Sequence, residues 1–184
     1  MERETDEILY ERHRRTGSNE DLRELLARYR EELCLFLYGL VRNMEDAEEL
    51  MLDAYAVASS GTARFDRRSS FKTWLFGIGR NLALKRLRKQ RFSFSELNEE
   101  MTSDQGTPEL ELLQNERNRM LYKALGSIPD DYRQALHLTY FENMSSDEVA
   151  AVLDKNKKQV YNLIARGKQA MKEALLKMGY EAGM

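Results

Sequence analysis

Apolar residues recur at intervals of three and four along most of the chain, and this spacing is the feature that most limits its fold. After an expected N-cap at Asn19, the apolar residues are Leu22, Leu25, Leu26, Tyr29, Leu33, Phe36, Leu37 and Leu40. Such spacing places apolar side chains along one face of a single long α-helix. With two prolines and ten glycines in 184 residues, a β-sandwich and a collagen-like chain are excluded. The sequence therefore predicts an all-α fold.

The same spacing predicts further helices, and short breaks separate them. These helices are expected over about 46–59, 71–91, 109–127 and 129–142. Gly61 and several serines mark 59–70 as a loop. Residues 93–108 lack a helical stripe and contain Gly106 and Pro108, so a flexible acidic linker is predicted there. The predicted architecture is thus two small helical domains, over 1–92 and 109–184.

Charge is strongly segregated, although the net charge of the chain is only −2. Residues 62–92 carry ten bases against one acid, a net charge of +9, and residues 93–116 carry seven acids and no base. A second basic cluster, over 154–172, has six bases against one acid. Two basic blocks divided by an acidic one predict two surfaces that bind a polyanion. The plain alternative is that these are solvated helix faces.

The clearest structural motif in the sequence lies near the C-terminus. Ser145 and Glu148 fit a capping box that begins a short helix, and a turn over 154–156 leads to a longer helix from about Lys158. This arrangement is the helix-turn-helix pattern, although a plain αα-hairpin shares its geometry. The exposed face favours DNA binding, because it carries residue types that contact bases and phosphates. These residues are Lys157, Lys158, Gln159, Tyr161, Asn162 and Arg166.

Several classes of protein are excluded. The N-terminus is charged from its second residue, which excludes a signal peptide, and no apolar run approaches the roughly 20 residues that cross a bilayer. A cytoplasmic protein without membrane insertion is predicted. The single Cys34 and two scattered histidines exclude a disulfide framework and a Cys/His zinc site. Catalytic constellations and phosphate-binding glycine loops are also absent, so neither an enzyme nor a cofactor is expected.

Two long segments resemble one known family. The run DAEELMLDAYAVAS over 46–59, followed by RFDRRSSFKTWLFGIGRNLALKRLRKQR over 64–91, resembles region two of the sigma-70 superfamily of bacterial transcription initiation factors. The run from IPDDYRQALHL to IARGKQAM, over 128–171, resembles region four. Their order and the shortness of the chain are typical of the extracytoplasmic-function group. The resemblance implies an RNA polymerase sigma factor that binds core RNA polymerase and promoter DNA, and an anti-sigma factor as a further partner.

The resemblance also implies roles for single residues. The helix from Asp46 would dock on core polymerase through Asp46, Glu49 and Asp53, although it could also be only a solvated acidic face. The loop and helix that follow would melt and hold the minus-ten element. The candidate minus-ten residues are Arg64, Ser69, Ser70, Lys72, Arg80, Asn81, Lys85 and Arg88. The helix from Lys158 would read the minus-thirty-five element in the major groove.

Some points stay open at the level of sequence. Phe71 and Trp74 fall on the apolar stripe, so they are expected in the core rather than under a DNA base. Asp154 stands where the family usually has glycine, and we expect it to keep the left-handed turn. The acidic linker could mimic RNA in the exit path of the polymerase, or could merely stay soluble and extended. Residues 1–18 could be a functional extension or a frayed terminus. Two other functions also remain: a stand-alone helix-turn-helix regulator, or a module that sequesters a partner.

Overall fold

The computed structural model of the chain describes residues 4–95 and 116–180, and every regular element in these ranges is a helix. The N-terminal helices are α1 (Asp6–Thr16), α2 (Asn19–Ala27), α3 (Arg30–Val41), α4 (Met44–Ser60) and α5 (Phe71–Ser95). The C-terminal helices are α6 (Glu116–Ser127), α7 (Asp130–Leu136), the π-helix η2 (His137–Phe141), α8 (Ser146–Leu153) and α9 (Lys157–Lys177). The all-α prediction is confirmed. Most of the predicted linker, and with it the question of its role, lies outside the described residues.

The long helix predicted after Asn19 is wrong, because the chain forms two helices there. Ser18, not Asn19, is the N-cap of α2, since its hydroxyl accepts a hydrogen bond from the amide of Asp21 at 3.3 Å. The break falls at Arg28 and Tyr29, and both side chains contact the carboxylate of Asp6 on α1. The apolar spacing continues across this break, which is why the sequence pattern alone hides it.

An aromatic cluster lies at the start of α5. Phe71 is fully buried, and its ring centroid lies 5.1 Å from that of Tyr10 and 5.6 Å from that of Trp74. Phe65, from the loop before α5, closes the cluster with its ring edge against Phe71. The prediction that Phe71 belongs to the core is therefore confirmed, whereas Trp74 is half-buried and packs against that core.

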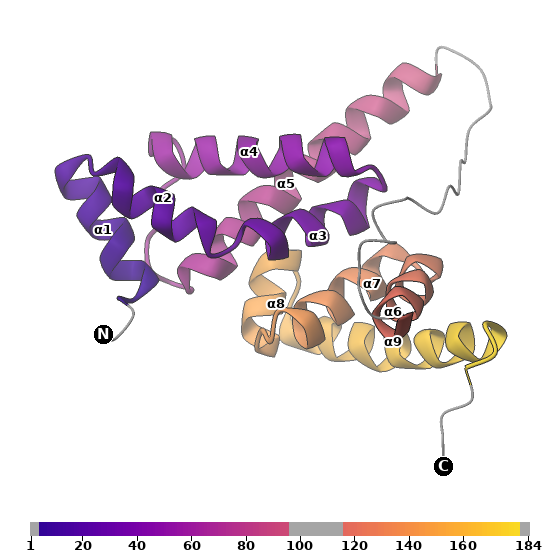
Figure 1. Ribbon diagram of the computed structural model, residues 1–184. Helices are drawn as coiled ribbons and strands as arrows, with labels where there is room; N and C mark the ends of the chain where they lie inside the picture. Colours follow the sequence, from indigo (N-terminus) through magenta and orange to yellow (C-terminus); the bar gives the residue numbers. More distant parts are fainter. Residues whose placement is uncertain (1–3, 96–115, 181–184) are drawn as a thin grey trace.

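The C-terminal helices pack beneath α3 and α5, and α9 is the outermost of them (Figure 1). One apolar cluster runs through both halves of the chain, so that Phe36 and Phe76 belong to the same core as Leu138, Val149 and Val160. The most extensive contacts between the halves join α5 to α8 and α3 to α7. The two halves thus meet directly through a buried face.

The helix-turn-helix geometry is confirmed in detail. The amide of Glu148 donates to the hydroxyl of Ser145 at 3.3 Å, and the amide of Ser145 donates to the carboxylate of Glu148 at 2.9 Å. Asp154 ends α8 in the left-handed region, with φ of 53°, as expected for the turn. Val160 is fully buried. A Cβ at Gly167 would lie 3.1 Å from the side chain of Leu136, so a glycine lets α9 approach α7 closely.

Candidate nucleic-acid interface

The predicted minus-ten residues divide into two groups in the structure. Arg64 in the loop and Asn81, Lys85 and Arg88 on α5 are exposed. They leave cationic and amide groups in contact with solvent, where phosphates and bases could reach them. Ser69 is half-buried, and its hydroxyl donates to the carbonyl of Ser70.

The other three minus-ten candidates face the C-terminal helices. The hydroxyl of Ser70 donates to the carboxylate of Glu148 on α8 at 3.1 Å. Arg80 is only 8% exposed, and its Nε donates to the amide oxygen of Gln134 on α7 at 2.7 Å. Burial lowers the pKa of Arg80. In this arrangement, Ser70 and Arg80 each form a hydrogen bond between the two halves of the chain.

Lys72 enters a buried cluster of charges between the halves. Its Nζ lies 2.8 Å from the carboxylate of Glu142, which is 3% exposed, and 3.2 Å from that of Glu32 on α3. His137 completes the cluster, with its Nε2 3.0 Å from the other carboxylate oxygen of Glu142. Burial raises the pKa of Glu142, but hydrogen bonds with His137 and Lys72 outweigh it and hold that pKa below its usual range. The carboxylate is therefore ionised at neutral pH.

The predicted polymerase-docking residues share one face of α4. Asp46 and Glu49 lie on either side of Arg86 from α5, at 3.0 Å from its two terminal nitrogens. The hydrogen bond with Glu49, together with the negative charges of Asp46 and Asp53, raises the pKa of Arg86. Glu49 and Asp53 are exposed, so the face retains accessible negative charge.

The recognition face of α9 is largely free. Lys158, Tyr161, Asn162 and Arg166 are exposed, and Tyr161 is 54% exposed although it is aromatic. Lys157 is also exposed, and its Nζ forms an ion pair with Asp147 of α8 at 3.0 Å. These side chains extend from one helical face, as contact with a DNA groove requires.

Gln159 helps to cap the N-terminus of α9, a role that was not predicted from the sequence. Its side-chain oxygen accepts from the amide of Asn156, and its own amide donates to the side chain of Asn156, both at 2.9 Å. The pair is a second capping box, which begins α9. The signal was present in the sequence, because Asn156 and Gln159 have the same spacing as Ser145 and Glu148.

The sequence also did not predict which residues contact Ser70, Lys72 and Arg80. Gln134, Glu142 and Glu148 lie 54 to 78 residues away in sequence from the side chains that they bind. No periodic pattern in the sequence predicts contacts between residues so far apart.

The sequence does not decide whether residues 1–18 form a functional extension or a frayed terminus. In the structure, residues 6–16 form the helix α1, and its residues Leu9 and Tyr10 are buried in the core.

Comparison with known proteins gives consistent matches over most of the chain. The Sigma-70 region 2 family matches residues 25–93, and the Sigma-70, region 4 family matches residues 118–171. The ECF RNA polymerase sigma factor SigW of Bacillus subtilis is 24% identical over 171 residues, which cover 86% of this chain and 91% of SigW. The RNA polymerase sigma-H factor of Pseudomonas aeruginosa is 26% identical and covers 99% of this chain and 100% of its own length.

Among solved structures, the sigma factor RpoE of Bartonella quintana, in complex with the anti-sigma factor NepR, has a similar fold. Its TM-score is 0.70 at 22% identity, and the match covers 85% of this chain and 97% of that one.

Proposed function

We infer that the chain, which belongs to the extracytoplasmic-function group of the sigma-70 superfamily, acts as an RNA polymerase sigma factor. It binds bacterial core RNA polymerase and directs promoter recognition and DNA melting for transcription initiation. The observation that carries this function is the presence, in order on one chain, of a region 2 match and a region 4 match. A stand-alone helix-turn-helix regulator is not favoured, because it would use only the region 4 part.

Core polymerase contacts the acidic face of α4. Glu49 and Asp53 are exposed there, and Asp46 lies in line with them at helical spacing. Arg86 neutralises part of this face from within the molecule, so the charge offered to a basic partner is concentrated toward Asp53.

The loop after α4 and the exposed face of α5 hold the non-template strand of the minus-ten element. Arg64, Lys85 and Arg88 neutralise its phosphates, and Asn81 reaches a base edge. Proteins that bind single-stranded DNA use such cationic side chains to follow its backbone, together with groups that contact the bases. On α9, Lys157, Lys158 and Arg166 contact phosphates or guanine, and Asn162 pairs with adenine in the minus-thirty-five duplex.

Full use of the minus-ten surface requires the two halves of the chain to separate. Ser70, Lys72 and Arg80 become available to DNA only when their contacts with Glu148, Glu142 and Gln134 are released. The face of α9 needs no such release, because its reading residues are already exposed. In the described arrangement of the halves, Ser70, Lys72 and Arg80 are therefore engaged within the protein rather than free to contact DNA.

The remaining properties follow from the same family. The factor works in the cytoplasm, where its polymerase is, and has no enzymatic activity of its own. Within residues 4–95 and 116–180, no helix combines the length and the apolar character needed to cross a bilayer. Because the similar RpoE structure contains an anti-sigma factor, we expect this chain also to be held inactive by one.

Run-off transcription tests the function. Core polymerase alone should give no defined transcript from a promoter library, and addition of the full-length protein should give transcripts with discrete starts. The control is the protein with Val160→Asp, which buries an unpaired charge and should lose promoter selection. Identical transcripts with and without the wild-type protein would refute the function.

A further inference from the structure

The helix α1 lies outside the segment that matches region 2, which begins at residue 25. It is nevertheless an integral part of the N-terminal helices. Leu9 is fully buried and Tyr10 is 5% exposed. The ring of Tyr10 packs on Phe65 and Phe71, and its hydroxyl donates to the carbonyl of Ala58 at 3.0 Å. The helix is therefore fixed to the end of α4 and the start of α5.

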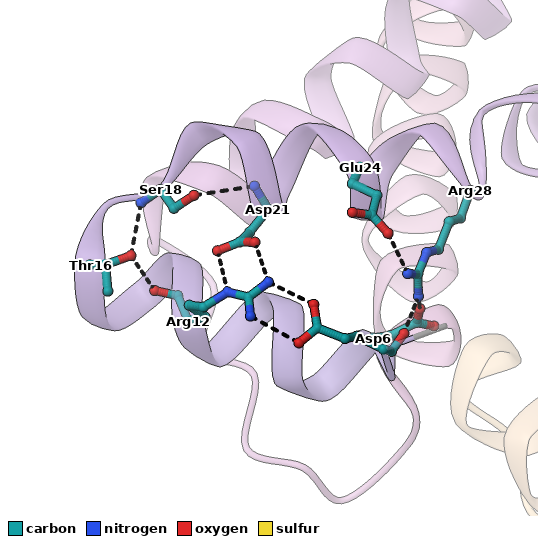
Figure 2. A network of polar contacts seen from close by, with 8 residues as sticks. Asp6, Arg12, Thr16, Ser18, Asp21, Glu24 and Arg28 are labelled. Atoms are coloured by element: carbon teal, nitrogen blue, oxygen red, sulfur yellow. Dashed lines mark hydrogen bonds and ion pairs between the residues drawn. The ribbon is translucent and has the colours of Figure 1, made fainter. Parts of the chain in front are cut away.

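A polar network fixes α1 to α2 as well (Figure 2). Two nitrogens of Arg12 donate to the two carboxylate oxygens of Asp21 at 2.8 and 2.6 Å, in the bidentate geometry that gives strong, directional pairing. The hydrogen bonds with Arg12 hold the pKa of Asp21 below its usual range. At the other end, Arg28 donates to Asp6 at 2.7 Å. The helix α1 cannot shift along α2 without breaking these pairs.

The remaining side of α1 contacts the loop 61–70 at its tip and at its end. At the tip, Arg67 donates to the carboxylate of Glu11 at 2.5 Å. At the end, the amide of Phe71, which begins α5, donates to the carboxylate of Glu7 at 3.3 Å. Two acidic residues, one turn apart on α1, thus contact the loop at Arg67 and the first residue after it, Phe71.

The loop also meets α1 where it begins. Gly61 has φ of 71°, and a Cβ there would overlap the guanidinium of Arg14. Between α1 and the loop lies a cavity of about 350 Å³, lined by Glu11 and Arg14 on one side and by Ala63 and Arg64 on the other. The minus-ten candidate Arg64 therefore lies at a cavity of which α1 forms one wall.

We propose that α1 is a positioning element for minus-ten recognition, in which Glu7 and Glu11 hold the loop 61–70 in the conformation that presents Arg64 to unpaired DNA. The proposal rests on the proposed function and extends it to a helix outside the matched regions. Arg67 occupies the left-handed region with φ of 60°, a conformation that is costly for arginine and needs an external contact to persist. A loop ordered in advance does not lose conformational entropy when DNA binds.

The test compares the double variant Glu7→Ala/Glu11→Ala with Glu24→Ala. Alanine has the highest helix propensity, so the substitutions preserve α1. Glu24 is the matched control, because its ion pair is with Arg28 in the network of Figure 2, away from the loop. Each full-length protein, with core polymerase, transcribes one promoter library randomised at the minus-ten positions and one randomised at the minus-thirty-five positions. The transcripts give the base preference at each position.

We expect the double variant to lose about two- to fivefold of its minus-ten base preference, the range that exposed ion pairs contribute to an equilibrium. Its minus-thirty-five preference, and both preferences of Glu24→Ala, should match the wild type. Hydrogen exchange should become faster in residues 61–71 of the double variant and stay unchanged in α3. An unchanged minus-ten preference, or an equal decline at both elements, would overturn the proposal. Absence of core-dependent transcripts with the wild type would instead refute the proposed function.

Discussion

Asp46 and Glu49 on α4 share Arg86, whereas Asp53 influences that arginine only at longer range. Reversal of either of the first two charges would place two cations side by side and disturb the contact between α4 and α5. Asp53→Lys changes the surface charge alone. We therefore expect it to weaken core polymerase binding severalfold, chiefly through slower association. A titration of labelled protein with core polymerase measures this effect.

The matched control for Asp53→Lys is Glu20→Lys, an equal charge reversal at an exposed position of α2. It should leave the affinity for core polymerase unchanged, and Asp53→Lys should keep the thermal midpoint of the wild type. An equal loss of affinity in the two variants would mean that only net charge matters. The acidic face of α4 would then be a solvated surface rather than a docking site.

At the scale of the element, the N-terminus of α9 separates capping from DNA reading. Asn162→Ala should cost about 1–3 kcal/mol of binding free energy on the preferred minus-thirty-five duplex and leave a scrambled duplex unaffected. Gln159→Ala removes the capping box with Asn156, so it should lower stability by about 1 kcal/mol and weaken binding to both duplexes alike. Binding titrations and thermal unfolding of both variants check this. A uniform loss for Asn162→Ala would contradict the assignment of that residue to base reading.

Elements and caps were predictable from the sequence to the extent that they depend on neighbouring residues. The capping box at Ser145 and the left-handed Asp154 are local, and both are confirmed. The break between α2 and α3 was not predicted, because the side chains at the break contact Asp6, which lies on another helix. The exposure of Lys85 could be predicted from its place on the polar face of its own helix. The burial of Arg80 could not, because it depends on Gln134 in the other half of the chain.

At the scale of the whole molecule, we expect the contact between the two halves to depend in part on the charge of Glu142. This carboxylate faces Lys72 from α5 and His137 from η2, and Glu32 on α3 shares the same lysine. A carboxyl whose pKa is lowered in the folded state contributes stability above its ordinary pKa, about 4.3, and loses it as the pH falls through the lowered value. The closed arrangement should therefore persist at neutral pH and open in acid.

Glu142→Gln should reproduce the acid effect at neutral pH, because it removes the charge and nearly preserves the shape. Removal of one member of a buried ion pair is strongly destabilising, so we expect the halves to separate in a large fraction of molecules. Spin labels on exposed Ala56 of α4 and exposed Ala165 of α9, in a Cys34→Ala background, measure the distance between the halves. Asp147→Asn is the control.

The control removes an exposed ion pair with Lys157, which lies within the C-terminal helices and does not join the halves. Its distance distribution should match that of the wild type, whereas Glu142→Gln should add a longer, broader component. The same variant should bind a single-stranded minus-ten oligonucleotide more tightly in the absence of polymerase, since Lys72 and Arg80 become accessible. If the distances in Glu142→Gln equal those of the wild type, apolar packing and the hydrogen bonds of Ser70 and Arg80 hold the halves together without the charge of Glu142. Release of Lys72 to DNA would then have to come from polymerase binding rather than from the loss of this charge.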